Sequence, residues 1–303
     1  RQEIKPLRAK EINLKLFPCD LVDDKGMKVL MKTIGSIKCL HKLGLEFFSA
    51  LRIKNRTLGY LQRTLYGQRR LKNFSLRFHR APEICDNGLR NLRKGLQRIC
   101  TLDQLSIQIS NVMKNTSQEG MTDFGVSEVC QALGFLPLLK RLNIGLESNC
   151  MTSRGLKLLK EAFLKLQNLR ELRVSYKPNF SFFEGDLEEL KDSIHSLTQL
   201  RKLELVCPYT TRDGGLENLK NLLQHFASVQ LSAELAQLNV DSQAKDPKAR
   251  CFKPLEELSL EFKHCFRITP VGWDFLQNGI QCLAQLKSLK LDFSECKTID
   301  DSI

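Results

Sequence analysis

The chain has 303 residues, of which 42% are hydrophobic and 27% are charged. This composition supports an extensive core and excludes a disordered or collagen-like chain, and no segment approaches the ~18 to 20 consecutive apolar residues that span a membrane. The net charge of +13 is carried by residues 1–100, which hold 23 basic and 8 acidic residues and indicate an acidic partner.

The apolar residues recur in a fixed pattern along the chain. An L-x-x-L-x-L-x-F motif begins at Leu40, Leu71 and Leu102, so these copies are 31 residues apart. Apolar residues at alternate positions predict a β-strand in each copy. Further copies begin at Leu139, Leu169, Leu200, Leu255 and Leu286, and a degenerate first copy begins at Ala9.

Each predicted strand is followed by a helical pattern. Apolar residues return 18, 21, 25 and 28 positions after the start of a copy, as Leu89, Leu92, Leu96 and Ile99 do. Spacings of three and four residues place these side chains on one face of a helix. Every repeat is therefore predicted to contain one strand, one turn and one amphipathic helix.

The predicted turns share small and polar residues. Asp86 stands two positions before Gly88, so we expect the Asp86 carboxylate to cap the following helix and Gly88 to permit a tight entry. A cysteine recurs ten positions after the start of a copy, and we expect it to be buried against the next repeat rather than to be a nucleophile. The residues at this position are Cys19, Cys265 and Cys296, with Cys150 one place later.

One interruption of the repeat follows Ile109. Six extra residues separate Ile109 from the helix at Val126, and the polar run 111–117 predicts a surface loop. Insertions in repeat proteins gather on one edge, where they either bind a partner or are simply tolerated.

The second interruption is the 55-residue interval that precedes the copy at Leu255. Within it, Leu235, Leu238 and Val240 predict a short degenerate strand. Residues 241–254 have no apolar period and predict an irregular inserted loop, either a docking loop or the remnant of a decayed repeat.

The consensus L-x-x-L-x-L-x-F-x-x-C-x-x-I-x-D-x-G-L resembles that of leucine-rich-repeat proteins of the ribonuclease-inhibitor-like class. The cysteine stands two residues later than in the usual repeat, and this longer form resembles the repeats of ciliate proteins. The resemblance implies an α/β solenoid, or horseshoe, with a parallel β-sheet on the concave face and α-helices on the convex face. We then expect residues 1–303 to form a single domain of about nine to ten repeats. Because the chain starts at Arg1 and stops at Ile303 inside a motif, we also expect it to be a segment of a longer protein.

Catalytic and cofactor motifs are absent from the sequence. It contains no Walker loop, G-x-S-x-G, H-E-x-x-H or kinase signature. The five histidines fall in different repeats, and the 11 cysteines include no pair at zinc-ligand spacing. We therefore predict no catalytic residue, metal, cofactor or small-molecule substrate, and a chain that is not an enzyme. The scattered cysteines indicate reduced thiols, as in the cytosol, nucleus or mitochondrial matrix.

Residues between the strand leucines are predicted to face outward on the concave sheet. These positions are mixed in charge and poor in aromatic residues, which favours a protein partner over a nucleic-acid groove. The charged candidates for partner binding are Lys42, Arg141, Arg173, Lys202, Glu257, Glu261 and Lys290.

The excess of basic residues lies on the predicted helices and their connections. Arg90, Arg93 and Lys94 share one helix face because they are three and four residues apart. Three interpretations stay open: a solvated convex surface, contact with an acidic protein surface such as tubulin, or contact with RNA phosphates. The candidate basic patch comprises Arg63, Arg69, Arg70, Lys72, Arg77, Arg80, Arg90, Arg93, Lys94 and Arg98.

These patterns predict a non-catalytic scaffold that binds proteins through its concave face and edges. The resemblance to ciliate repeats places it in the cytoplasm, in a cilium or another part of the microtubule cytoskeleton. One alternative is a component of an RNA-protein particle that uses the same basic residues. Another is the substrate-recognition subunit of a ubiquitin ligase, since F-box proteins use similar repeats.

Overall fold

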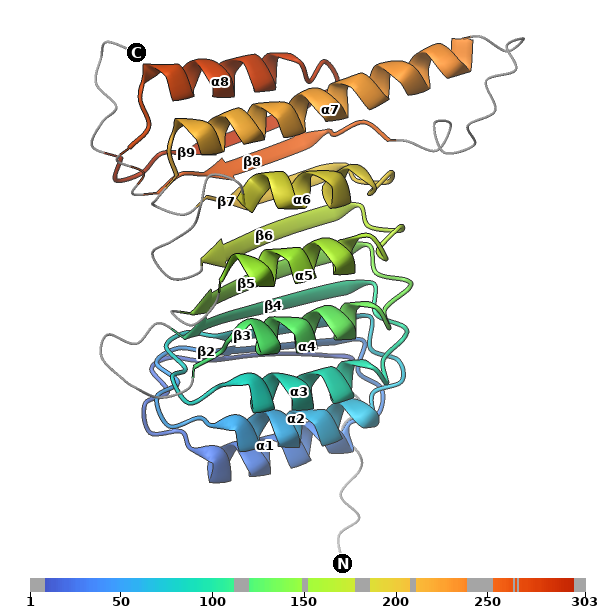
Figure 1. Cartoon of the computed structure of the whole chain (residues 1–303). Coiled ribbons are helices and arrows are strands. Elements are labelled where there is room, and N and C mark those ends of the chain that lie inside the picture. Colours follow the sequence, from blue (N-terminus) through green and yellow to red (C-terminus); the bar gives the residue numbers. More distant parts are fainter. Residues whose placement is uncertain are drawn as a thin grey trace, which may run out of the picture.

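Strands and helices alternate along the chain, as the repeat predicts. The computed structural model describes residues 9–111, 120–148, 152–177, 186–207, 211–238, 253–263, 265 and 267–296. Figure 1 shows the helices stacked on one side of a single sheet. The architecture is that of a leucine-rich-repeat α/β solenoid, in agreement with the predicted fold class.

Nine strands form one parallel sheet in which spatial order follows sequence order. Neighbouring strands pair at equivalent repeat positions, so Leu43 lies opposite Phe74 and Phe74 opposite Leu105. The strands are β1 (Glu11–Leu16), β2 (Lys42–Phe47), β3 (Asn73–Phe78), β4 (Gln104–Asn111), β5 (Arg141–Ser148), β6 (Glu171–Lys177), β7 (Lys202–Val206), β8 (Glu257–Glu261) and β9 (Ser288–Asp292).

The helices cover one face of this sheet and leave the other face open (Figure 1). The open face is the surface that the resemblance predicts to be concave. The helices are α1 (Asp24–Ser36), α2 (Asn55–Tyr66), α3 (Asp86–Leu96), α4 (Asp123–Leu133), α5 (Ser153–Phe163), α6 (Asp186–His195), α7 (Asp213–Leu238) and α8 (Pro270–Gln281).

The core lies between the sheet and the helices. Residues of β2 and β3 alternate between buried and half-buried, which puts the leucine and phenylalanine positions inward. The helical set Leu89, Leu92, Leu96 and Ile99 is buried as predicted. Burying a large aliphatic side chain contributes roughly 1.5 to 3 kcal/mol, so the repeated apolar positions stabilise every layer of the solenoid.

The expectation that Asp86 caps its own helix is wrong. Asp86 is the first residue of α3, and its carboxylate accepts the backbone N–H of Thr122 at 2.8 Å and the Thr122 hydroxyl at 2.6 Å. Asp213 accepts the same two bonds from Thr269. These aspartates therefore join one turn to the next. At α1, by contrast, the residue directly before the helix is Asp23, and its carboxylate does cap that helix.

Two of the recurring cysteines are buried turn residues, as predicted, whereas Cys296 is half-buried. Cys19 and Cys265 are buried, and the Cys19 thiol donates to the Phe48 carbonyl of the next repeat at 2.8 Å. Cys296 donates to the Phe262 carbonyl of the preceding repeat, also at 2.8 Å. Cys150 lies outside the described residues. The thiols thus connect adjacent layers, as the aspartates do.

The predicted degenerate strand is wrong where the structure describes it. Leu235 and Leu238 belong to α7, a continuous helix of 26 residues, and β7 pairs directly with β8. Two leucines three positions apart suit a helix as well as a short strand, and the hydrogen bonds of α7 extend through them. Val240 and most of the predicted loop 241–254 lie outside the described residues, as do residues 112–119 of the earlier insertion.

Candidate functional site

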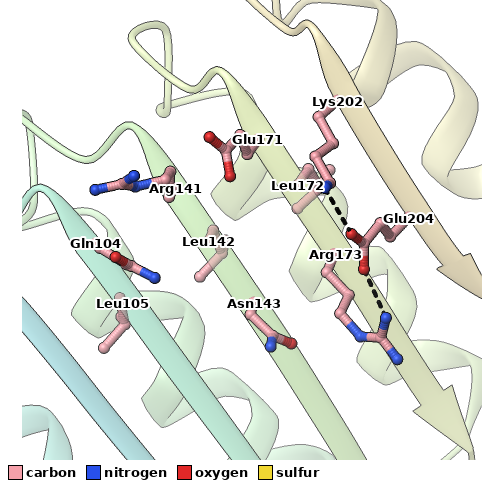
Figure 2. A pocket seen from close by; sticks show the side chains of 10 residues that line it. All are labelled: Gln104, Leu105, Arg141, Leu142, Asn143, Glu171, Leu172, Arg173, Lys202 and Glu204. Atoms are coloured by element: carbon pink, nitrogen blue, oxygen red, sulfur yellow. Dashed lines mark hydrogen bonds and ion pairs between the residues drawn. The ribbon is translucent and has the colours of Figure 1, made fainter. Parts of the chain in front are cut away.

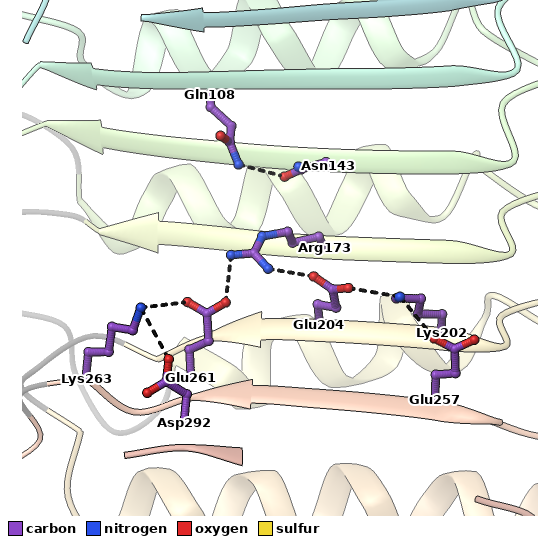
Figure 3. Close-up of polar contacts among 9 residues, drawn as sticks. All are labelled: Gln108, Asn143, Arg173, Lys202, Glu204, Glu257, Glu261, Lys263 and Asp292. Carbon is purple, nitrogen blue, oxygen red and sulfur yellow. Dashed lines mark hydrogen bonds and ion pairs between the residues drawn. The ribbon is translucent and has the colours of Figure 1, made fainter. Parts of the chain in front are cut away.

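Charged side chains on the open face of the sheet form a connected network across β6, β7 and β8 (Figure 3). Arg173 contacts Glu204 at 2.6 Å and Glu261 at 2.8 Å, so its guanidinium reaches from β6 past β7 to β8. Lys202 lies 3.2 Å from Glu204 and 3.0 Å from Glu257. Four of the predicted concave-face residues therefore neutralise one another or Glu204.

The network keeps a partly buried carboxylate ionised. Burial alone would raise the pKa of the Glu204 carboxyl, but hydrogen bonds from Arg173 and Lys202 outweigh it and hold that pKa below its usual value. Glu204 consequently stays ionised at neutral pH. An ion pair that is already satisfied internally offers little net charge to a partner, so this part of the sheet presents shape and hydrogen-bonding groups more than net charge.

A second network lies at the N-terminal end of the open face. Glu46 contacts Arg77 at 2.6 Å and Lys15 at 3.1 Å, and Lys42 lies 3.7 Å from Glu11. Arg77 thus belongs to the open face, paired with an acid, and lies apart from the helix residues of the predicted basic patch.

Two hollows on the open face are lined in part by residues of the network across β6, β7 and β8. One of about 160 Å³ is lined by Arg141, Asn143, Glu171 and Arg173, among others (Figure 2). A second of about 320 Å³ continues toward the strand ends beside Gly145, whose missing side chain leaves room. Arg141 comes within 3.9 Å of Asp103, and Lys290 forms no ion pair with any described residue.

On the helix side, the basic residues of the predicted patch fall into two groups: those that contact Glu128, an acid outside the patch, and those that do not. Arg90 and Arg93 of α3 both contact Glu128 of α4, Arg90 at 3.0 Å. Burial favours a raised pKa for Glu128, but hydrogen bonds from the two arginines outweigh it and lower that pKa. Glu128 was missed because it stands one repeat further on, beyond the insertion that shifts the sequence register.

The remaining patch residues are exposed on helices and turns. Arg69, Arg70 and Lys72 follow α2, Arg80 follows β3 with a positive φ of 51°, and the Arg98 guanidinium lies 5.8 Å from the centre of the Tyr66 ring. None of these five basic residues is ion-paired within the described part of the chain.

One row of cations runs across three helices. Lys32, Arg63 and Lys94 occupy the same position in three consecutive repeats, 31 residues apart, and all three are exposed. The sequence prediction included Arg63 and Lys94 but omitted Lys32 and its neighbour Lys28. The sequence spacing could have identified both lysines, because Lys28 and Lys32 are four residues apart and therefore share one face of α1.

In the described ranges, no three His, Cys, Asp or Glu side chains gather in a way that could hold a metal ion, and no helix combines the length and apolar character that crossing a bilayer requires. His195 and His225 do meet, with ring centres 3.4 Å apart, although their positions in separate repeats gave no indication of contact.

The chain matches no family model and no curated protein. Among solved structures it is similar to the crystal structure of the leucine-rich repeat-containing protein LegL7 from Legionella pneumophila. The sequence identity is 14% and the TM-score 0.44, with 99% of this chain and 88% of that chain covered. The fold is defined by the parallel sheet, its register and the repeated core.

Proposed function

We propose that the chain is a non-catalytic scaffold for protein–protein interaction that attaches to an acidic protein surface through α1, α2 and α3. The observation that supports this function is the row of Lys32, Arg63 and Lys94. These exposed cations have no ion-pair partner among the residues described, and α2 contains no acidic residue. Neighbouring packed helices are about 8 to 10 Å apart, so the row presents charge at regular intervals.

The open face contributes differently to this function. Its charged residues are mostly paired with one another, as Arg173 is with Glu204 and Glu261. Ionic attachment therefore belongs to the helix side, while the hollows of the sheet supply shape for a further protein contact.

Tubulin is the acidic partner that we propose, in a cilium or another microtubule assembly. This choice is supported by the resemblance of the long repeat to ciliate proteins and by the free cations of the row. A regular acidic polymer would meet the three equally spaced charges together, which raises avidity without requiring a deep interface.

Cosedimentation with stabilised microtubules tests this function. We expect binding at about 50 mM salt that weakens at about 300 mM, because screening shortens the range of exposed charges. Reversing the row with Lys32→Glu, Arg63→Glu and Lys94→Glu should abolish binding. Reversing three exposed cations elsewhere, Arg154, Arg267 and Lys165, is the matched control and should retain most of it.

Absence of cosedimentation at low ionic strength would contradict tubulin as the partner. Equal losses in the two triple variants would show that net charge, rather than the row, drives binding. Tighter binding to poly(U) RNA than to microtubules, lost in the row variant, would favour an RNA-protein particle instead.

A further inference from the structure

An open groove lies between α1 and α2 on the helix side of the solenoid. Its cavity has a volume of about 250 Å³ and is lined by Lys28, Met31, Lys32, Gly35, Tyr60, Arg63 and Thr64. Three of these residues are cations and none is acidic, so the groove has the charge of an anion-binding site.

Gly35 keeps this groove open. The equivalent positions of the next two repeats hold Tyr66, the last residue of α2, and Gln97, which directly follows α3; both are larger. The atoms nearest to a Cβ added at Gly35 belong to Thr64, at 3.7 to 3.9 Å, which is ordinary van der Waals contact. Between α2 and α3, a Cβ on Gly95 would come within 3.1 Å of the Gln62 Cα, so those two helices pack too closely to leave an equivalent space.

The three cations at the rim lack counter-ions. Lys28 and Lys32 are four residues apart on α1, where like charges repel, and Arg63 faces them from α2. In the described part of the chain none of them forms an ion pair, and all three are exposed. A bound carboxylate would relieve this repulsion, which gives an acidic ligand an advantage over a neutral one.

The floor of the groove can accept the aliphatic part of a side chain. Met31 and Thr64 are buried there, and the Thr64 hydroxyl donates to the Met31 carbonyl at 2.8 Å. That hydroxyl is therefore already satisfied. A glutamate could lay its methylene groups on this floor and place its carboxylate among the rim cations.

A comparable hollow between α4 and α5 lacks this charge. Its volume is about 210 Å³, and its lining includes one acid, Asp123, and one base, Arg154. A hollow between consecutive helices therefore does not by itself have the charge of an anion-binding site. The combination of an open groove with three unpaired cations distinguishes the α1–α2 site.

We propose that the α1–α2 groove binds an acidic peptide segment of the partner protein, with one glutamate or aspartate side chain seated between Lys28, Lys32 and Arg63. The cavity is smaller than the ~300 to 1,000 Å³ of typical ligand pockets, which suits a single side chain better than a separate small molecule. This inference rests on the proposed function and names where the acidic partner is held.

Binding of a fluorescein-labelled polyglutamate peptide, followed by anisotropy, tests the site on the whole chain. Neutralising the rim with Lys28→Gln, Lys32→Gln and Arg63→Gln should weaken binding about tenfold, as expected for the loss of three modest ion pairs. The matched control removes the same charge outside both the groove and the row of cations, with Arg69→Gln, Arg70→Gln and Lys72→Gln, and should weaken binding less than about threefold.

Gly35→Leu separates the shape of the groove from its charge. This change fills the space without altering any charge, and leucine has a higher helix propensity than glycine, so the fold should persist. We expect a loss of affinity of about tenfold, whereas Gly35→Ala, which fits the available space, should bind as the unchanged chain does. Circular dichroism melting of each variant confirms folding.

Equal weakening by the two triple variants, or unchanged binding by Gly35→Leu, would overturn the groove and leave the proposed scaffold intact. Failure of the unchanged chain to bind either polyglutamate or microtubules would overturn both proposals. Binding of poly(U) RNA that depends on the same three cations, with none of polyglutamate, would overturn the acidic-peptide assignment in favour of RNA.

Discussion

On the helix side, the net charge that a basic residue presents depends on its ion-pair partners in the neighbouring repeat. Glu128 contacts both Arg90 and Arg93, so two of the residues predicted to bind a partner are already ion-paired and their combined positive charge is reduced. The sequence identified these arginines but could not identify their partner, because the pairing depends on how α3 packs beside α4. Spacing within one helix gives no information about such a contact.

Removal of this acid should therefore increase attraction to an acidic partner. Glu128→Gln frees Arg90 and Arg93 while preserving the size of the side chain, and we expect polyglutamate to bind about threefold more tightly at low salt. Anisotropy titration measures the change, with Glu161→Gln on α5 as a control for loss of a single negative charge. Weaker binding in Glu128→Gln would show that the two arginines need this acid to be held in position.

The stacked histidines predict a response to pH. Burial, followed by repulsion from His225, lowers the pKa of His195 to about 4, and burial also lowers the pKa of His225. Lys191 and Asp192 are the other charged groups that affect the pair. Unfolding lets both rings take up protons near their usual pKa of about 6.5, so stability should be lost as the pH falls from about 6.5 toward 4.

Urea unfolding at pH 7 and pH 5 measures this effect. The His195 contribution should reach about 1 kcal/mol at pH 5, after allowance for the partial exposure of the ring. His195→Phe keeps a flat ring that does not titrate, and should reduce the loss of stability between these pH values. An unchanged loss in that variant would show that other groups control the acid response.

At the scale of secondary-structure elements, the contacts between turns explain why glycine occupies several positions of the repeat. Gly125 occupies the third position of α4, and an added Cβ there would lie 2.5 Å from the Asp86 carboxylate and 2.7 Å from Leu89 Cδ1. The sequence indicated that glycine is needed at this point of the repeat. The reason it suggested, a tight entry to the helix, differs from the observed one, which is the side chain of the preceding repeat.

Gly125→Ala should consequently destabilise the chain by about 1 to 3 kcal/mol, because the Asp86–Thr122 connection or the core must shift. Gly134→Ala is a suitable control, since an added Cβ would meet nothing closer than 3.4 Å and its φ of −62° suits any residue. Chemical denaturation distinguishes the two variants. Equal stabilities would show that the turn relaxes around the added methyl group at little cost.

The molecule as a whole shows which properties a periodic sequence can predict. Positions such as Leu43, Phe74 and Leu105 recur at a fixed interval, and that interval determines both the strand register and the core. The groove at Gly35 could not be found in this way, because periodicity treats Gly35 and Tyr66 as equivalent. Binding features lie where equivalent positions differ, and their effect emerges only when neighbouring repeats are packed together.

Charge distribution over the whole solenoid predicts that its two ends respond to salt in opposite ways. The first 100 residues carry 23 basic and 8 acidic side chains, so the N-terminal repeats repel themselves at low ionic strength. Around β6 to β8 the charges instead attract one another, through Arg173, Lys202 and their acidic partners. Added salt screens both effects.

Hydrogen–deuterium exchange at about 50 mM and 500 mM salt tests this difference, since the Debye length falls severalfold between them. We expect slower exchange at high salt in β1, β2 and β3, where repulsion is relieved, and unchanged or faster exchange in β6, β7 and β8, where attraction is weakened. In a repeat protein each layer contacts only its neighbours, so local stabilities can change independently. A uniform change along the sheet would instead mean that the solenoid opens as one cooperative unit and that charge at one end is felt throughout.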